Sequence, residues 1–269
     1  MNPKFVNQKQ ARDLIMNGIN LDLKGQKVLV TGASAGLGAY ICKAFSEAGA
    51  EIGIHYNSNS ENAIALQQEL SRKVLAHTMK ANLEAPEGAR LLFQDAADKL
   101  GEVSILVNCA ANASQSVCDF ADLTDDIWKT TQEVNVKAPL ILTQEFARQG
   151  ISGSIINISS IEAKQPAKGH THYSVSKSAL ESLTKASAAE LGSLDIRVNG
   201  IAPGLINREG IRTGWPEGVA LWEDNAPLGR LVDPADVSSA AVFLASDKAK
   251  SITGTVLTVD CGLSATPSW

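Results

Sequence analysis

The sequence predicts an α/β fold, in which one doubly wound parallel sheet of about seven strands carries helices on both faces. Short apolar runs alternate with longer segments of helical periodicity from about residue 25 to the C-terminus. These runs end in small or polar residues, which is typical of strands buried on both faces. No Pro/Gly/Ser-rich linker divides the chain. We therefore expect a single domain, residues 25–269, after an N-terminal extension, residues 1–24.

The elements follow one another in a regular order. β-Branched and aliphatic runs predict strands within 26–31, 51–56, 73–82, 103–111, 153–160, 195–204 and 255–260. Apolar residues at helical spacing predict helices over 37–49, 61–71, 86–101, 124–148, 173–191 and 234–245. The segment 207–225 fits this alternation least well, and long excursions of this kind are often functional. We therefore expect a lid around residues 205–225.

Composition narrows the class of protein. The 24 Lys and Arg residues and 29 Asp and Glu residues are interspersed, which argues against nucleic-acid and membrane partners. Cys42, Cys109, Cys118 and Cys261 show no C-x-x-C spacing, so we expect reduced thiols and no metal site. The N-terminus lacks the apolar core of a secretory signal, and no apolar run reaches the roughly 18 residues of a membrane span. A cytoplasmic protein acting on a small molecule is expected.

A glycine turn, "TGASAGLG" (Thr31–Gly38), lies between the first strand and the first helix. Its glycines allow the backbone to turn tightly and to approach a phosphate, and the helix that follows offers unpaired N–H groups and the positive end of its dipole. Any tight strand-to-helix turn can use glycine. After the first strand of a doubly wound sheet, however, the pattern favours a dinucleotide.

Tyr173 and Lys177 are four residues apart in the helical stretch "HTHYSVSKSAL". A free tyrosine has a pKa near 10, and lowering it to about 7 takes roughly 4 kcal/mol. An ammonium group one helical turn away favours the phenolate, and a positively charged nicotinamide would add to this effect. The pair therefore indicates acid/base chemistry at an alcohol or carbonyl oxygen. The alternative is a solvated lysine beside a structural tyrosine.

Several motifs together resemble the short-chain dehydrogenase/reductase family, from about Leu23 to Leu263. They are the G-x-x-x-G-x-G turn, "NCAA" (108–111), "VNV" (134–136), "NISS" (157–160), Tyr173 with Lys177, and "PG" (203–204). The resemblance implies a Rossmann-type fold, usually assembled as a homotetramer. It also implies an NAD(P)-dependent enzyme acting on CH–OH groups.

The resemblance further implies a catalytic tetrad of Asn135, Ser160, Tyr173 and Lys177. Tyr173 would exchange the proton, Ser160 would orient the reacting oxygen, and Asn135 would anchor a water in a proton relay through Lys177. Taken as bare residues, Ser159 competes with Ser160. Asn135 could equally be a buried amide that satisfies backbone groups.

The cofactor site is expected at the carboxyl ends of the strands. Tyr56 stands where NAD-selective sheets carry an acidic residue, while Asn57 and Ala35 stand where NADP-selective relatives carry a basic one. NADP is favoured, and use of both cofactors is possible. The expected binding residues are Gly32, Ser34, Ala35, Gly36, Leu37, Gly38, Tyr56, Asn57, Ser58, Asn82, Leu83, Asn108, Ala110, Tyr173, Lys177, Pro203, Gly204 and Ile206.

Glu162, Arg208 and Arg212 are the candidate substrate residues. Arg208 falls where the family often has a threonine; alternatively, either arginine pairs with Glu209 or Glu217. Trp215 and Trp222 either close over a sugar or pack the lid onto the body. By analogy we expect a secondary alcohol (or a lactol) of a sugar, polyol or sugar acid to be interconverted with its ketone (or lactone). The alternatives are a 3-oxoacyl-thioester reductase, an epimerase or a non-catalytic cofactor-binding relative.

Overall fold

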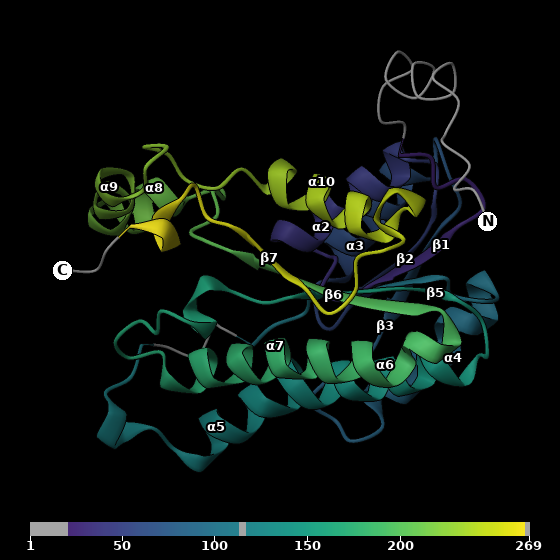
Figure 1. Cartoon of the computed structure of the whole chain (residues 1–269), viewed down its shortest axis with the longest axis horizontal. Coiled ribbons are helices and arrows are strands. Elements are labelled where there is room, and N and C mark those ends of the chain that lie inside the picture. Colours follow the sequence, from purple (N-terminus) through teal and green to yellow (C-terminus); the bar gives the residue numbers. More distant parts are fainter. Residues whose placement is uncertain (1–20, 113–116, 267–269) are drawn as a thin grey trace, which may run out of the picture.

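The computed structural model describes residues 21–112 and 117–266, so Trp269 and most of the N-terminal extension lie outside the described residues. Seven strands form one parallel sheet in the order β3-β2-β1-β4-β5-β6-β7 (Figure 1). Their bounds are β1 (Lys27–Val30), β2 (Glu51–Tyr56), β3 (Ala76–Lys80), β4 (Ile105–Asn108), β5 (Gly153–Ile158), β6 (Ile196–Pro203) and β7 (Val256–Val259). Every strand expected from the sequence is present, and the doubly wound fold is confirmed.

Helices cover both faces of this sheet. Figure 1 shows α2, α3 and α10 above it, and α4, α6 and α7 below it. The bounds are α2 (Gly36–Glu47), α3 (Ser60–Leu70), α4 (Gly88–Leu100), α5 (Asp125–Gln132), α6 (Ala138–Arg148), α7 (Thr171–Leu191), α8 (Ile211–Gly214), α9 (Pro216–Asn225) and α10 (Pro234–Ala245). Side-chain caps begin several of them: Thr124 accepts from the Ile127 N–H, and Asp233 accepts from the Ala235 N–H.

The single helix expected over 124–148 is interrupted in the structure. A π-helical turn, Glu133–Lys137, separates α5 from α6 and carries Asn135. Such turns occur often at functional sites and give no simple sign in apolar periodicity. Asn135 is buried within this turn, and the helical path continues into α6.

Two apolar layers hold the helices to the sheet. Strand residues such as Val28 and Ile54 pack against α2, α3 and α10 on one face, whereas Leu29 and Leu106 pack against α4, α6 and α7 on the other. Because successive strand residues point to opposite faces, β1, β3, β4, β5 and β6 contribute to both layers. This explains why the strands are continuous apolar runs.

The strand order reverses between β1 and β4, since the chain runs from β1 to β2 on one side and later returns to β4 on the other. In open α/β sheets, ligands bind in the crevice outside the carboxyl ends of the strands at such a point. The glycine turn after β1 and the segment after β4 both lie there. The fold therefore places the predicted site at this edge.

Substitution of Phe146 tests the packing of the apolar layer between the sheet and α4, α6 and α7. The Phe146 side chain is fully buried on α6 and meets Phe93 of α4 edge to face, with ring centroids 6.5 Å apart. We expect Phe146→Ala to lower the free energy of unfolding by about 3–5 kcal/mol, measured by urea denaturation. Phe120→Ala is the matched control, because Phe120 is 78% exposed, and it should change the value by about 0.5 kcal/mol or less. Equal losses in the two variants would contradict this packing.

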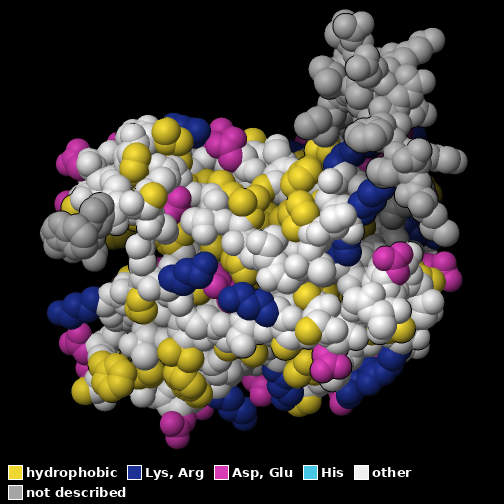
Figure 2. All heavy atoms as spheres, viewed as in Figure 1, with side chains coloured by type: hydrophobic (Ala, Val, Ile, Leu, Met, Phe, Trp, Pro, Cys, Tyr) yellow, Lys and Arg dark blue, Asp and Glu magenta, His cyan; other side chains and the backbone are white. Residues whose placement is uncertain are grey.

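None of the helices in residues 21–112 and 117–266 is long and apolar enough to cross a membrane. Within the same part of the chain, no three His, Cys, Asp or Glu side chains come together in a way that could hold a metal ion. On the face seen in Figure 2, acidic and basic side chains are interspersed rather than gathered by sign.

Candidate active site

The glycine turn packs tightly against the neighbouring strand ends. A Cβ atom on Gly32 would lie 2.8 Å from the Ala110 Cα, and one on Gly38 would lie 2.3 Å from the Gly32 carbonyl oxygen. Thr31 ties the turn to β4, since its Oγ1 accepts from the N–H groups of Cys109 and Ala110, both at 2.9 Å. Only glycine fits these two positions.

The start of α2 is open to a ligand. Its N-cap residue, Ala35, provides no side-chain hydrogen bond to the first turn. The N–H groups of the first turn therefore remain available beside the cavity, together with the positive end of the helix dipole. This is the arrangement that binds the phosphates of a nucleotide.

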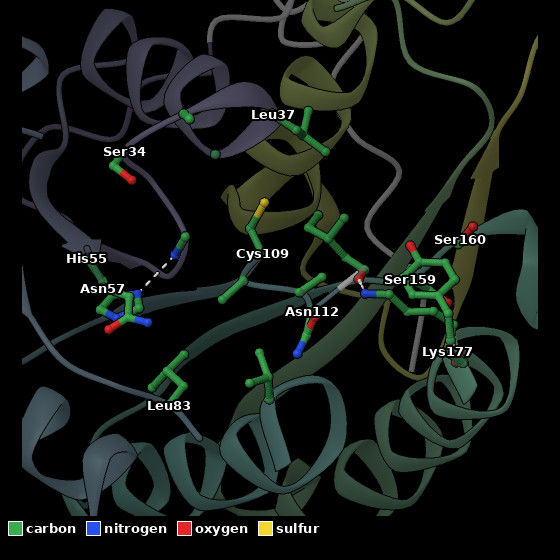
Figure 3. A pocket seen from close by; sticks show the side chains of 18 of the residues that line it. Ser34, Leu37, His55, Asn57, Leu83, Cys109, Asn112, Ser159, Ser160 and Lys177 are labelled. Carbon is green, nitrogen blue, oxygen red and sulfur yellow. Dashed lines mark hydrogen bonds between the residues drawn. The ribbon is translucent and has the colours of Figure 1, made fainter. Parts of the chain in front are cut away.

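A cavity of about 530 Å³ runs along the carboxyl ends of the strands. Figure 3 shows Ser34, His55 and Asn57 toward one end and Ser160 and Lys177 toward the other. Of the predicted residues, those that line it are Gly32, Ser34, Ala35, Leu37, Gly38, Asn57, Ser58, Asn82, Leu83, Ala110, Ser160, Tyr173, Lys177, Pro203, Gly204 and Ile206. The structure thus brings both ends of the predicted site into one cavity.

Tyr173, Ser160 and Lys177 meet at one end of this cavity. The Lys177 Nζ lies 5.5 Å from the centroid of the Tyr173 ring and donates a hydrogen bond to the Ile158 carbonyl oxygen at 2.8 Å. Lys177 is only 2% exposed. Because α7 carries both residues one turn apart, their spacing is built into the helix. Ser160 lines the same cavity as these two residues.

The pKa of Tyr173 differs from the sequence-based expectation. Burial, followed by the negative charge of Glu162, raises it to about 12, although a hydrogen bond with Ser160 acts to lower it. Burial also lowers the pKa of Lys177 to about 8, so its positive charge is itself costly in this environment. The chain alone therefore keeps Tyr173 protonated at neutral pH, as an acid facing the cavity.

Asn135 does not line the cavity but supports its wall. It is fully buried in the π-helical turn, and its Oδ1 accepts from the Asn112 N–H at 2.7 Å. Its Nδ2 donates to the Asn112 carbonyl oxygen at 3.3 Å and to Ser176 Oγ at 2.9 Å. These contacts are those of a buried amide that satisfies backbone groups, one of the two functions considered from the sequence. The other, anchoring a water in a proton relay through Lys177, stays a prediction.

Three predicted cofactor residues lie outside the cavity lining. Tyr56 packs against the apolar layer beneath α2 and α3, and Gly36 is exposed at the start of α2. Asn108 is buried, and its Nδ2 donates to Asn157 Oδ1 at 2.8 Å. Asn108 therefore connects the ends of β4 and β5 without lining the cavity.

The predicted substrate residues separate into two groups. Arg208 and Arg212 do not line the cavity. Arg212 is exposed and pairs with Glu223 at 2.8 Å, within the segment of α8 and α9, rather than with Glu209 or Glu217. Trp222 packs against Gly204, and its Nε1–H donates to the Arg230 carbonyl oxygen.

Glu162, by contrast, lies beside the catalytic end. Its backbone N–H donates to Ser160 Oγ at 3.2 Å. Its carboxylate contacts His170 Nδ1 at 3.1 Å and accepts from Ser174 Oγ at 3.2 Å. The Glu162 and His170 side chains keep 21% and 34% of their surface exposed. A polar cluster of Glu162, His170 and Ser174 thus adjoins Ser160 and Tyr173.

Sequence reasoning missed several residues of the cavity wall. They are His55, Asn59, Glu84, Cys109, Ala111, Asn112, Val134 and Ile158; Ser159, considered as the competitor of Ser160, lines the cavity as well. Most are adjacent in sequence to predicted residues, so proximity was an available signal. Burial raises the pKa of Cys109 to about 11, which keeps that thiol protonated.

Comparisons with known proteins agree with the class that this site defines, a dinucleotide-dependent oxidoreductase. The family model described as "Enoyl-(Acyl carrier protein) reductase" matches residues 32–264. An L-rhamnose-1-dehydrogenase from Scheffersomyces stipitis is 32% identical over 90% of this chain and 96% of its own. An L-xylulose reductase from Caenorhabditis elegans is 34% identical over 91% and 98%.

A solved structure is similar along the whole fold. It is a gluconate 5-dehydrogenase from Burkholderia cenocepacia in complex with NADP and tartrate, 27% identical, with a TM-score of 0.83. The match covers 92% of this chain and 98% of that one. This chain belongs to the short-chain dehydrogenase/reductase family. It is an NAD(P)-dependent dehydrogenase/reductase that acts on CH–OH groups.

Proposed function

We propose that this enzyme interconverts a secondary alcohol or lactol of a sugar, polyol or sugar acid with the corresponding ketone or lactone, with NADP as the preferred cofactor. The observation that carries the proposal is the single cavity that joins the glycine turn to Tyr173, Ser160 and Lys177. Relatives with sugar substrates in their names support the substrate class.

The chain's own residues bind and orient the substrate and exchange the proton at its reacting oxygen. When bound, the cofactor exchanges a hydride with the substrate carbon and, in its oxidised form, brings a positive charge. Ser160 hydrogen-bonds the reacting oxygen, and Tyr173 gives a proton to that oxygen in reduction and takes it in oxidation. Lys177 lies on the same helix face and favours the phenolate during oxidation. Asn135 holds the backbone of Asn112 beside them.

The far end of the cavity supports the NADP preference. Ser34, Asn57 and Ser58 line it with hydroxyl and amide groups that can hydrogen-bond a 2′-phosphate. Tyr56, at the end of β2, carries no charge that would repel it. Glu84 also lines the cavity, and its carboxylate disfavours a phosphate there and so reduces the preference for NADP. A preference for NADP with measurable use of NAD follows.

The cluster of Glu162, His170 and Ser174 supports a polyhydroxylated substrate. A carboxylate and an imidazole beside Ser160 and Tyr173 can accept and donate hydrogen bonds with a hydroxyl next to the reacting carbon. The segment of α8 and α9 is the proposed lid. Arg208 or Arg212 reaches an anionic substrate only if this segment moves toward the cavity.

We further infer a cytoplasmic homotetramer. The thiols Cys42, Cys109, Cys118 and Cys261 are all free, as suits a reducing compartment. The large side chains Trp128, Leu140 and Val175 lie exposed on α5, α6 and α7, and Leu257 on the edge strand β7. Light scattering after size-exclusion chromatography should give the mass of four chains. A monomer would contradict the assembly.

The substrate class is tested by a screen of aldoses, polyols and sugar acids with NADP⁺ and NAD⁺, followed as formation of reduced cofactor. We expect turnover of at least one of these compounds, faster with NADP⁺. A 3-oxoacyl thioester with NADPH is the comparison substrate. Turnover of the thioester alone would replace the sugar proposal with a 3-oxoacyl-thioester reductase.

Glu162→Gln provides a pH test of the catalytic end. The carboxylate beside Tyr173 disfavours the phenolate and so raises the pKa of Tyr173. Removing its charge therefore lowers that pKa and makes the base available at lower pH. We expect the acidic limb of kcat/KM for oxidation to move down by about 0.5–1 pH unit. A limb that stays in place or moves up would contradict this effect of Glu162.

A further inference from the structure

His55 is a buried residue of the cavity wall that neither the motifs nor the catalytic chemistry uses. It is the penultimate residue of β2 and is 2% exposed. It lies between two backbone segments, the glycine turn after β1 and the chain that follows β3. Figure 3 shows its ring beside the cavity at the end away from Lys177.

His55 holds both of these segments. The Gly32 N–H donates to His55 Nδ1 at 3.0 Å, and the Ala33 N–H donates to the His55 carbonyl oxygen at 2.8 Å. On the other side of the ring, Nε2 lies 3.2 Å from the Ala81 carbonyl oxygen. Each ring nitrogen therefore has one partner. One partner follows the end of β1, and the other follows the end of β3.

The partners determine the state of the ring. A backbone N–H can only donate, so Nδ1 must carry no proton, and a carbonyl can only accept, so Nε2 must carry one. Burial lowers the pKa of His55 to about 4, which keeps this neutral form throughout the physiological range. A protonated ring would place two N–H groups face to face at Gly32.

We propose that His55 is a positioning residue for the cofactor, whose neutral ring holds Gly32 and thereby presets the glycine turn for the diphosphate. The N–H groups of Gly32 and Ala33 are directed to His55, which leaves those at the start of α2 facing the cavity. Thr31 holds the same turn to β4, so His55 supplies the tie to β2 and β3. This inference rests on the proposed function in taking the cavity as the dinucleotide site.

Two substitutions test the contributions of the two ring nitrogens separately. In His55→Asn the amide oxygen takes the place of Nδ1, and in His55→Gln the amide nitrogen takes the place of Nε2. We expect His55→Asn to keep the Kd for NADPH within about threefold of wild type. We expect His55→Gln to raise it about tenfold or more, which corresponds to the loss of roughly one hydrogen bond's free energy. In both variants kcat at saturating cofactor should stay within about threefold.

His77→Gln is the control, since His77 on β3 does not line the cavity, and it should leave the Kd unchanged. A merely structural role for His55 would lower the Tm of both variants without separating their Kd values. Equal Kd values for the two variants, or a loss confined to kcat, would overturn the proposal. Wild-type protein that binds neither NADPH nor NADH would instead overturn the cofactor site itself.

A measurement on the wild-type protein covers the case in which a variant fails to fold. Imidazole nitrogen NMR should show His55 as the neutral Nε2–H tautomer at pH 6, and this signature should persist when NADPH binds. A charged ring, or a proton on Nδ1, would overturn the proposal without any substitution.

Discussion

Tyr173→Phe is expected to lower kcat/KM by about 10³-fold while the Kd for NADPH changes by no more than about threefold. In the proposed mechanism the phenol oxygen exchanges a proton with the substrate, and a phenylalanine ring keeps the shape of the wall without that oxygen. Without cofactor, the pKa of Tyr173 is raised to about 12, so at neutral pH the phenol holds the proton that reduction needs. Initial rates and a fluorescence titration measure the two quantities.

Tyr40→Phe is the matched control for this loss. Tyr40 lies on α2 with half of its surface exposed and does not line the cavity. It should leave both rate and affinity unchanged. If Tyr173→Phe kept more than about a tenth of the wild-type kcat/KM, the acid/base function of Tyr173 would be wrong.

Lys177→Met is expected to damage turnover and cofactor binding together. Lys177 lines the cavity, and its buried Nζ lies 5.5 Å from the centroid of the Tyr173 ring. Methionine fills the space without charge or donor. We expect kcat/KM to fall by about 10³-fold and the Kd for NADPH to rise about tenfold.

Lys185→Met, two turns further along α7, is the control, because Lys185 is exposed. Its rate and Kd should match the wild type. A Lys177→Met variant that lost turnover but bound NADPH normally would contradict the binding half of the prediction. A variant that stayed active would contradict the whole of it.

The strands and the catalytic helix could be predicted because their signals are local. The apolar runs identify strands buried on both faces, and a spacing of four residues places Tyr173 and Lys177 on one helix face. The glycine turn is a local signal too, since Gly32 and Gly38 stand where a Cβ would meet backbone. The edge at which these parts meet follows from the strand order.

What could not be predicted depends on contacts between distant segments. The pKa of Tyr173 reflects its burial and the nearby Glu162, which the sequence separates by eleven residues. The partner of Arg212 is Glu223 because α8 and α9 fold onto each other. His55 acts through Gly32 and Ala81, one on either side of it in the sheet. Residues 1–20 lie outside the described residues, so the expectation of an N-terminal extension stays a prediction.

The most direct test of the site is a fluorescence titration of the purified protein with NADPH and, separately, with NADH. We predict saturable binding at one site per chain, tighter for NADPH, and binding of NADPH about tenfold weaker in Lys177→Met. Binding of neither cofactor would contradict the assignment of the cavity, and with it the acid/base function of Tyr173. Tighter binding of NADH would reverse the proposed preference and direct the substrate screen to NAD⁺.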